Sequence, residues 1–303
     1  NITFNIRQDN YKSKYKSIST VSDYYGNNTS SDNPQFNKDE RTLSARIGFK
    51  FNNYNISISR GHKAGGFNQN PFISDLNRIY RPEYSNNLDF TYKNIIGPLN
   101  LKLNIFYMNR EDLHVNIAEQ ADEDNPLSFY FFTSNIKNGI NKGMDLNMSI
   151  KINKNSNIFI NAGALHTMRE SFSYPKGIDE ENNVIYELKP AREQARAPRY
   201  TLNVGLESYL TSKFFMRIEV SGKDKFYYFD NEEQMSKAYN ILNLNTRYKF
   251  NDNLSIAFNI QNLLNEKYSI HAFYFSLDGY MPTQLYESPG SPRSYGIKID
   301  YTF

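Results

Sequence analysis

The sequence lacks cysteine and tryptophan, and it contains no long run of apolar residues. The absence of cysteine excludes disulfide scaffolds, thiolate zinc sites and cysteine nucleophiles. No stretch approaches the ~18 apolar residues that a membrane helix needs, so helical membrane proteins are excluded. The net charge of +3 is too small and too dispersed to indicate a protein that binds nucleic acid.

Aromatic residues, in contrast, are abundant. The 303 residues include 24 Tyr and 22 Phe, although the mean hydropathy is polar, at -0.68. So many aromatic side chains exclude a disordered chain. A polar mean together with many aromatics is compatible with a membrane β-barrel, because the strands of such a barrel are apolar on only one face.

The dominant pattern is an alternation of apolar and polar residues with a period of two. Over residues 254–261, for example, Leu, Ile, Phe and Ile alternate with Ser, Ala, Asn and Gln. Alternation over about eight residues is typical of a strand with one apolar and one wet face. We expect about twelve such strands, beginning near Asn1, Arg41, Tyr54, Arg81, Leu99, Thr133, Ser156, Ala197, Lys213, Ala238, Leu254 and Pro292.

The connections between these strands alternate in length. We expect short turns, rich in Asn and Gly, at 52–53, 94–98, 153–155, 211–212 and 251–253. We expect long polar loops at 11–40, 62–80, 111–132, 168–196, 223–237 and 266–291. Short turns at one end and long loops at the other are typical of an outer-membrane barrel. The sequence therefore predicts an all-β, antiparallel, up-and-down transmembrane barrel, whose polar lumen is lined by charged residues such as Arg46, Lys102, Arg217 and Arg247.

Both ends of the chain bear on its organisation. The last strand carries Tyr295, Tyr301 and Phe303 on one face, and it ends on that Phe. In a soluble protein this strand would leave an apolar edge, whereas in a barrel it closes against a partner strand. The chain begins without Met or an apolar leader, in what reads as the middle of a strand. We therefore expect it to be a piece of a longer protein.

Four segments resemble those of TonB-dependent outer-membrane receptors of the iron-complex type. They are 59–68 (SRGHKAGGFN), 81–93 with its Pro-Glu pair, 259–268 (NIQNLLNEKY) and 290–303 (GSPRSYGIKIDYTF). In the last segment, Lys298 departs from the small residue that is usual there. Each motif alone is weak, but their order and spacing across nearly the whole chain make the resemblance strong.

The resemblance implies a barrel of about twenty-two strands that encloses an N-terminal plug. Residues 1–303 contain neither a recognisable plug nor a TonB box, so we expect one domain that forms the C-terminal part of the barrel. The implied function is TonB-dependent uptake of a ferric siderophore or similar iron chelate in the outer membrane of a Gram-negative bacterium. The resemblance implies no enzymatic activity and no cofactor.

The resemblance also implies a set of partners. These are outer-membrane lipid and lipopolysaccharide, the plug and through it TonB, and the transported chelate. The barrel-assembly machinery would recognise the C-terminal strand, with the residues Arg293, Tyr295, Tyr301 and Phe303.

Candidate ligand contacts lie where the strands meet the long loops. Arg and Tyr suit an anionic ferric chelate through charge, stacking and hydrogen bonds. The same side chains at a barrel rim would equally bind lipopolysaccharide phosphates or anchor the barrel in the membrane interface. Histidines in this region are either ligand contacts or polar loop residues. The candidates are Arg60, His62, Arg81, Arg110, His114, Arg169, Arg192, Arg196 and Tyr274.

Motifs for metal binding and catalysis are weak. The sequence has no His-x-x-x-His pair, so no dedicated metal site is predicted. Two acidic runs, 122–124 and 179–181, are either solvated loops or cation ligands, and they lack the spacing of a calcium loop. Three alternatives stay open: uptake of another ligand such as cobalamin or an oligosaccharide, a self-contained twelve-stranded porin or autotransporter barrel, and an outer-membrane hydrolase, although no Gly-x-Ser-x-Gly elbow is present.

Overall fold

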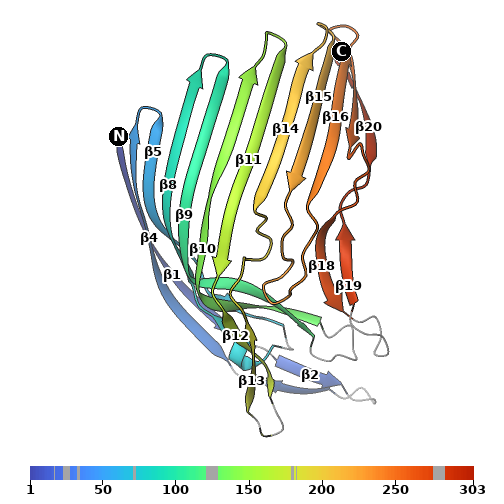
Figure 1. Ribbon diagram of the computed structural model, residues 1–303. Helices are drawn as coiled ribbons and strands as arrows, with labels where there is room; N and C mark the ends of the chain where they lie inside the picture. The colour runs from blue at the N-terminus through green and yellow to red at the C-terminus, as the bar shows by residue number, and fades with distance from the viewer. Residues whose placement is uncertain are drawn as a thin grey trace.

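One antiparallel sheet of 12 strands dominates the structure (Figure 1). The computed structural model describes residues 1–16, 18–22, 28–32, 35–70, 73–120, 129–178, 181, 183–275 and 284–303. The strands of the sheet are β1 (Ile2–Tyr15), β4 (Phe36–Phe51), β5 (Tyr54–Lys63), β8 (Glu83–Ile96), β9 (Leu99–Gln120), β10 (Phe129–Lys151), β11 (Ser156–Arg169), β14 (Tyr200–Tyr209), β15 (Phe214–Lys223), β16 (Tyr239–Lys249), β17 (Leu254–Gln261) and β20 (Ser294–Tyr301).

The order of these strands confirms the predicted up-and-down topology. Neighbours in the sheet follow the order of the chain, and every pair is antiparallel. The predicted short turns are confirmed, except that β8 continues through 94–96 and narrows the turn predicted at 94–98 to residues 97–98. Asn52 and Gly97 adopt positive φ angles of 49° and 57° within these turns. Asn and Gly tolerate this backbone conformation, which explains why they occupy the turns.

Most of the predicted long loops, in contrast, contain strands. The strands β9 and β10 run into the segment 111–132, and β1 and β4 run into the segment 11–40. Polar side chains do not prevent pairing, because the backbone alone supplies the hydrogen bonds of a hairpin. Short two-stranded pairs also form in four of the long connections. They are β2 (Ile18–Ser22) with β3 (Asn28–Asp32), β6 (Gly66–Phe67) with β7 (Ile79–Tyr80), β12 (Phe172–Ile178) with β13 (Val184–Lys189), and β18 (Ser269–Phe275) with β19 (Gln284–Pro289).

One face of the sheet is apolar and exposed. Ile47 and Ile58, which pair across β4 and β5, are 52% and 59% exposed. A soluble protein would bury such side chains, so this face is the surface that contacts lipid. Other exposed apolar residues with the same alternation are Ile2, Phe4, Ile6, Phe49, Ile56, Ile105, Phe258, Ile297 and Ile299. Within the described residues, no helix is long and apolar enough to cross a membrane.

The strands β1 and β20 form the two edges of the sheet, as far as the described residues show. The predicted closing strand is β20, and it pairs with β17 through Tyr295 opposite Ile260 and Tyr301 opposite Leu254. Phe303 lies beyond the last of these pairs. Closure of β20 against a further strand therefore stays a prediction.

At the end of the sheet opposite the short turns, the connecting segments pack into a compact structure that we call the cap. The cap comprises the ends of β9 and β10, the pairs β6–β7, β12–β13 and β18–β19, the 3-10 helix η1 (Asp75–Asn77) and the segments 190–199 and 224–238. Figure 1 shows the ends of β9 and β10 bending across towards β18. Both faces of this bent hairpin contact other parts of the cap. One face packs on Ile73, Phe172 and Tyr174, and Ala118 on the other packs on Phe226, Tyr228 and Phe229.

Candidate functional site

The cap encloses a cavity of ≈ 160 Å³ that brings three of the predicted site residues together. Arg110 and His114 reach it from β9, and Arg196 reaches it from the segment between β13 and β14. Gln194 and Asp230 also line this cavity. The cavity is therefore built from parts of the chain that are far apart in sequence, and it is rich in hydrogen-bond donors.

Arg110 is held in place by an ion pair. Its Nε donates to Glu83 Oε1 at 2.5 Å, and its Nη1 donates to Gln194 Oε1 at 3.0 Å. The other carboxylate oxygen of Glu83 accepts from the backbone N–H of His114 at 2.9 Å. Because the Glu83 side chain is only 7% exposed, this network fixes the guanidinium of Arg110 at the wall of the cavity.

His114 links the cavity to Arg81. Its Nε2 lies 2.6 Å from the carbonyl oxygen of Arg81, so Nε2 carries the proton and donates it. Arg81 in turn contacts Asp112 at 2.5 Å. Burial lowers the pKa of His114 below its usual value of 6.5, and the nearby cation of Lys63 acts in the same direction. The imidazole is therefore neutral at pH 7.

Arg169 and Arg192 do not line the cavity, but they hold the segment 224–238, which contributes to its lining, through hydrogen bonds. Arg169 is fully buried and donates to the carbonyl oxygens of Pro190 and Asp230, at 2.6 and 2.8 Å. Arg192 donates to those of Phe229 and Asp230, at 2.7 and 2.8 Å. Burial and the neighbouring Arg192 lower the pKa of Arg169 to about 10, so it stays charged at pH 7. Both guanidinium groups are engaged by the main chain, and direct contact with a ligand stays a prediction for them.

Arg196 is the exposed arginine of the cavity. Its backbone adopts a positive φ of 57°, a conformation that costs about 1–2 kcal/mol for a residue with a side chain. Its N–H donates to Tyr227 O at 2.8 Å, which holds that conformation. Strained residues of this kind cluster at binding sites.

The other three predicted contacts lie away from the cavity. Arg60 bonds Asn86 and Glu111 at 2.8 and 3.1 Å, and it lines a separate recess. His62 lies 2.8 Å from the hydroxyl groups of both Thr42 and Ser44.

Tyr274 lies on β18 opposite Leu285. Its pKa is raised by burial and by Glu232.

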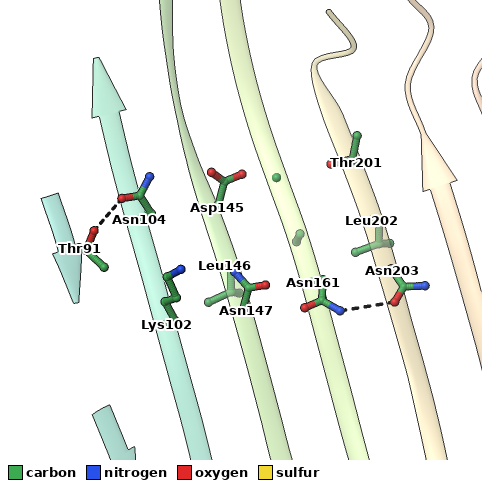
Figure 2. Close-up of a pocket in the computed structure, with 12 residues that line it drawn as sticks. Thr91, Lys102, Asn104, Asp145, Leu146, Asn147, Asn161, Thr201, Leu202 and Asn203 are labelled. Atoms are coloured by element: carbon green, nitrogen blue, oxygen red, sulfur yellow. Dashed lines mark hydrogen bonds between the residues drawn. The ribbon is translucent and has the colours of Figure 1, made fainter. Parts of the chain in front are cut away.

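The polar face of the sheet carries a second feature, a shallow recess of ≈ 590 Å³ (Figure 2). Lys102 and Asp145 line it together with amide side chains from four strands. Thr91 donates to Asn104 at 2.9 Å, and Asn161 donates to Asn203 at 3.4 Å. This wall therefore offers neutral hydrogen-bonding groups with one cation and one anion.

The other lumen-facing arginines differ in how far they are already paired. Arg217 is bridged to Glu207 at 2.6 Å and to Glu219 at 2.5 Å, and it lies over the ring of Phe159. Arg46 donates to Ser57 at 3.1 Å. Arg247 is exposed. Contact of these residues with a plug stays a prediction.

No pattern in the sequence singles out Gln194 or Asp230, and Glu83 belongs only to the Pro-Glu pair of the segment 81–93. Gln194 lies between the two candidate residues Arg192 and Arg196, and this position was the signal that could have identified it as a site residue. The acidic residues 122–124 and 179–180 lie outside the described residues. Among the residues that the structure describes, no group of three or more His, Asp or Glu side chains is placed to hold a metal.

Comparison with known proteins assigns the fold. A family model described as "TonB dependent receptor-like, beta-barrel" matches residues 1–263. The ferric yersiniabactin uptake receptor FyuA from Yersinia pestis matches over 100% of this chain and 43% of its own, with a TM-score of 0.73 and 16% identity. The siderophore receptor PiuA from Acinetobacter baumannii matches over 99% of this chain and 40% of its own, with a TM-score of 0.69 and 16% identity.

A third similar structure, the copper transporter OprC, covers 100% of this chain and 46% of its own, with a TM-score of 0.68 and 14% identity. The chain thus spans less than half the length of these structures. No curated protein matches the sequence. The matched proteins are receptors and transporters of the outer membrane rather than enzymes. The chain belongs to the TonB-dependent receptor family, and its sheet is part of an outer-membrane β-barrel.

Proposed function

We propose that this chain forms part of the wall and cap of a receptor for TonB-dependent uptake of a ferric siderophore or a similar iron chelate. The observation that carries the proposal is the cavity in the cap, where Arg110, Arg196 and the neutral imidazole of His114 converge. Arginine donors in a partly dry cavity favour anionic oxygen ligands, which many iron chelates present.

The size of the cavity limits what it holds. A volume of ≈ 160 Å³ is smaller than the roughly 300–1,000 Å³ of a site that encloses a whole drug-sized ligand. We therefore propose that one anionic arm of the chelate enters the cavity and that the rest lies on the outer surface of the cap. Arg196, which is exposed, makes the first contact, and Arg110 is fixed by Glu83 as the deeper donor.

The lumen wall has the second role in the proposed function. The family resemblance implies a plug, which would contact lumen residues such as Lys102 and Arg247. An Asn-rich surface suits contacts that form and break, because neutral hydrogen bonds contribute only about 0.5–1.5 kcal/mol each. Force transmitted by TonB would then move the plug along this wall.

Binding of chelates tests the proposal. Cells that carry the receptor would be offered ferric catecholate, hydroxamate and carboxylate siderophores labelled with radioactive iron, with cobalamin and an oligosaccharide as competitors. We expect saturable binding of one iron class, and uptake that stops when TonB is deleted. Saturable binding of cobalamin or the sugar, with no chelate bound, would contradict the proposal.

The variant Arg196→Gln tests the site itself. Loss of one charge-assisted hydrogen bond, worth about 1.5–3 kcal/mol, predicts binding of the chelate that is weaker by about tenfold or more. The matched control is Arg199→Gln, because Arg199 pairs with Glu193 and does not line the cavity. Equal weakening by the two variants would place the site elsewhere.

A further inference from the structure

The hydroxyl group of Tyr174 joins two hairpins of the cap. Tyr174 lies on β12 and is fully buried. Its Oη contacts Glu119 Oε1 on β9, and it lies 3.2 Å from Glu187 Oε2 on β13. Figure 1 shows β12 and β13 at the end of the molecule opposite the short turns. The hydroxyl and the two carboxyl groups, which we call the clasp, therefore connect this outer hairpin to the bent hairpin of β9 and β10.

The clasp contains more oxygen–oxygen contacts than the hydroxyl proton alone can fill. A tyrosine hydroxyl donates one hydrogen bond, and an ionised carboxylate donates none. Burial and the contact with Glu119 raise the pKa of Tyr174, so its hydroxyl keeps that single proton. Contact with two carboxyl groups therefore needs a second proton, which one of the carboxyl groups must carry.

The second proton belongs on Glu119 rather than on Glu187. Lys189 contacts Glu187 Oε1, and Lys176 Nζ lies 3.1 Å from Glu187 Oε2. Although burial opposes them, these two cations hold the pKa of Glu187 below its usual value. None of the ion pairs among the described residues involves Glu119. Burial raises the pKa of Glu119 above its usual value of 4.5, the charge on Glu187 adds to this rise, and the two lysines offset it only in part.

Two further titratable groups face the clasp from other elements. Tyr130 on β10 is directly opposite Glu119 in the register of the bent hairpin, and burial raises its pKa, so it is neutral at pH 7. Glu232, in the segment 224–238, also has a pKa raised by burial, and the charges on Glu119 and Glu187 raise it further. Ionisation of Glu119 therefore adds a negative charge beside two other carboxyl groups, which is unfavourable.

The bent hairpin is fixed in position next to Glu119. Asn231 accepts from the N–H of Ala118 at 3.2 Å and donates to the carbonyl oxygen of Ala118 at 2.8 Å. Ala118 also belongs to the buried cluster of Phe226 and Tyr228. The strands β12 and β13, in contrast, pair with each other in a sheet of two strands. When the clasp is broken, the outer hairpin is therefore the element that moves.

We propose that the clasp is a pH-dependent device, in which a proton on Glu119 holds the β12–β13 hairpin against the bent hairpin and loss of this proton releases it. In the closed form, Glu119 donates to the hydroxyl of Tyr174, and Tyr174 donates to Glu187. A carboxyl group whose pKa is raised by folding stabilises the folded form fully below its unfolded value, here 4.5, and this contribution is lost as the pH rises through the raised pKa. The direction is opposite to that expected for His114, whose pKa is lowered by burial.

Hydrogen exchange of the backbone amides in 172–177 and 184–189 tests the proposal. It would be measured by mass spectrometry on the purified protein in detergent and corrected for intrinsic rates. We expect protection to fall about tenfold between about pH 4.5 and pH 8, because one hydrogen bond to a charged network is lost. Glu119→Gln should keep the protection of the acid form throughout, since its amide donates to Tyr174 and does not titrate. Tyr174→Phe should lack this protection at both pH values.

Two control variants identify the titrating group, and retention of folded mobility in unheated gels confirms each variant. Glu232→Gln and Glu170→Gln should keep the pH dependence of the parent protein, because Glu170 is exposed and bonds Asn138 away from the clasp. In infrared difference spectra, the C=O band of a protonated carboxyl group should disappear over the same pH range in the parent and be missing in Glu119→Gln.

Three outcomes would overturn the proposal. The first is constant protection of the outer hairpin in the parent protein. The second is a Glu119→Gln or Tyr174→Phe variant that keeps the pH dependence of the parent. The third is loss of that dependence in Glu232→Gln alone, which would make Glu232 the titrating group.

Discussion

Asn262 fixes the end of β17 with a single side chain. Its Nδ2 donates to Glu266 O at 2.9 Å and to Ser291 O at 3.1 Å, and its Oδ1 accepts from the N–H of Glu266 at 2.8 Å. The residue is 1% exposed, and its φ of 51° suits asparagine. These bonds join the turn after β17 to the start of β20, which gives the Asn-Leu-Leu-Asn motif a physical cause.

The variant Asn262→Ala should lower the free energy of unfolding by about 2–4 kcal/mol, because it removes three hydrogen bonds made by a buried side chain. The measurement is unfolding in urea, followed by the loss of folded mobility in unheated gels. Asn53→Ala, in an exposed turn, is the control and should change stability by less than about 0.5 kcal/mol. Equal effects of the two variants would contradict this role of Asn262.

His114 makes the cap sensitive to pH. Its pKa is lowered by burial, so the neutral imidazole stabilises the cap at pH values above 6.5, the value expected for the unfolded chain. This contribution is lost as the pH falls through the lowered pKa, since a charged imidazole near Lys63 and Arg110 is unfavourable. Hydrogen exchange around 113–117, corrected for intrinsic rates, should therefore speed up as the pH falls below about 6.5.

The variant His114→Gln should remove this pH dependence, because glutamine does not titrate while its amide still donates a hydrogen bond. If the variant and the parent protein lose protection equally on acidification, His114 is not the titrating group.

At the scale of elements, the bent hairpin of β9 and β10 organises the cap. Leu113, Val115 and Ile117 alternate in the sequence, and they are 2%, 2% and 0% exposed. They pack on Ile73 and on Phe172, which lie on other connections. The hairpin therefore determines how three connections that are separate in sequence meet.

Ile117→Ala should destabilise the cap by about 2–5 kcal/mol, because it opens a cavity in a fully buried cluster. Limited proteolysis should then cut the cap while the membrane-spanning part of the sheet stays protected. The control is Ile185→Ala, since Ile185 is 49% exposed on β13. Unchanged proteolysis in Ile117→Ala would show that the hairpin does not hold the cap together.

Sequence patterns predicted the strands of the sheet better than they predicted the cap. Alternation over residues 254–261 is a local signal, and it was enough to identify β17 and its neighbours. Leu113, Val115 and Ile117 also alternate with polar residues, but over too short a stretch to identify this strand, and the burial of Leu113 depends on Phe172, almost sixty positions away. The candidate site could be predicted only in part for the same reason. Residue type alone identifies Arg110 and His114 as candidates, but their contact with the same cavity as Gln194 and Asp230 depends on the folded cap.

At the scale of the whole molecule, the sheet separates two environments. Isoleucine and phenylalanine cover one face, whereas asparagine, serine and paired charges such as Arg217 with Glu219 cover the other. This separation explains the polar mean hydropathy of a chain that nevertheless lies in a membrane. The edges at β1 and β20 are where further strands would pair, because an unpaired edge in lipid leaves backbone hydrogen bonds unsatisfied.

Cysteine scanning of β17 tests the membrane-spanning wall most directly. Because the sequence contains no native cysteine, the reagent reacts with the introduced cysteine and with no other. Single cysteines would replace each residue from Leu254 to Gln261 in turn, in membranes, and react with a lipid-soluble or a water-soluble maleimide. We predict alternation: Phe258→Cys reacts with the lipid-soluble reagent, and Asn259→Cys reacts only with the water-soluble one. Reaction of successive positions with the same reagent, without a period of two, would contradict the barrel wall.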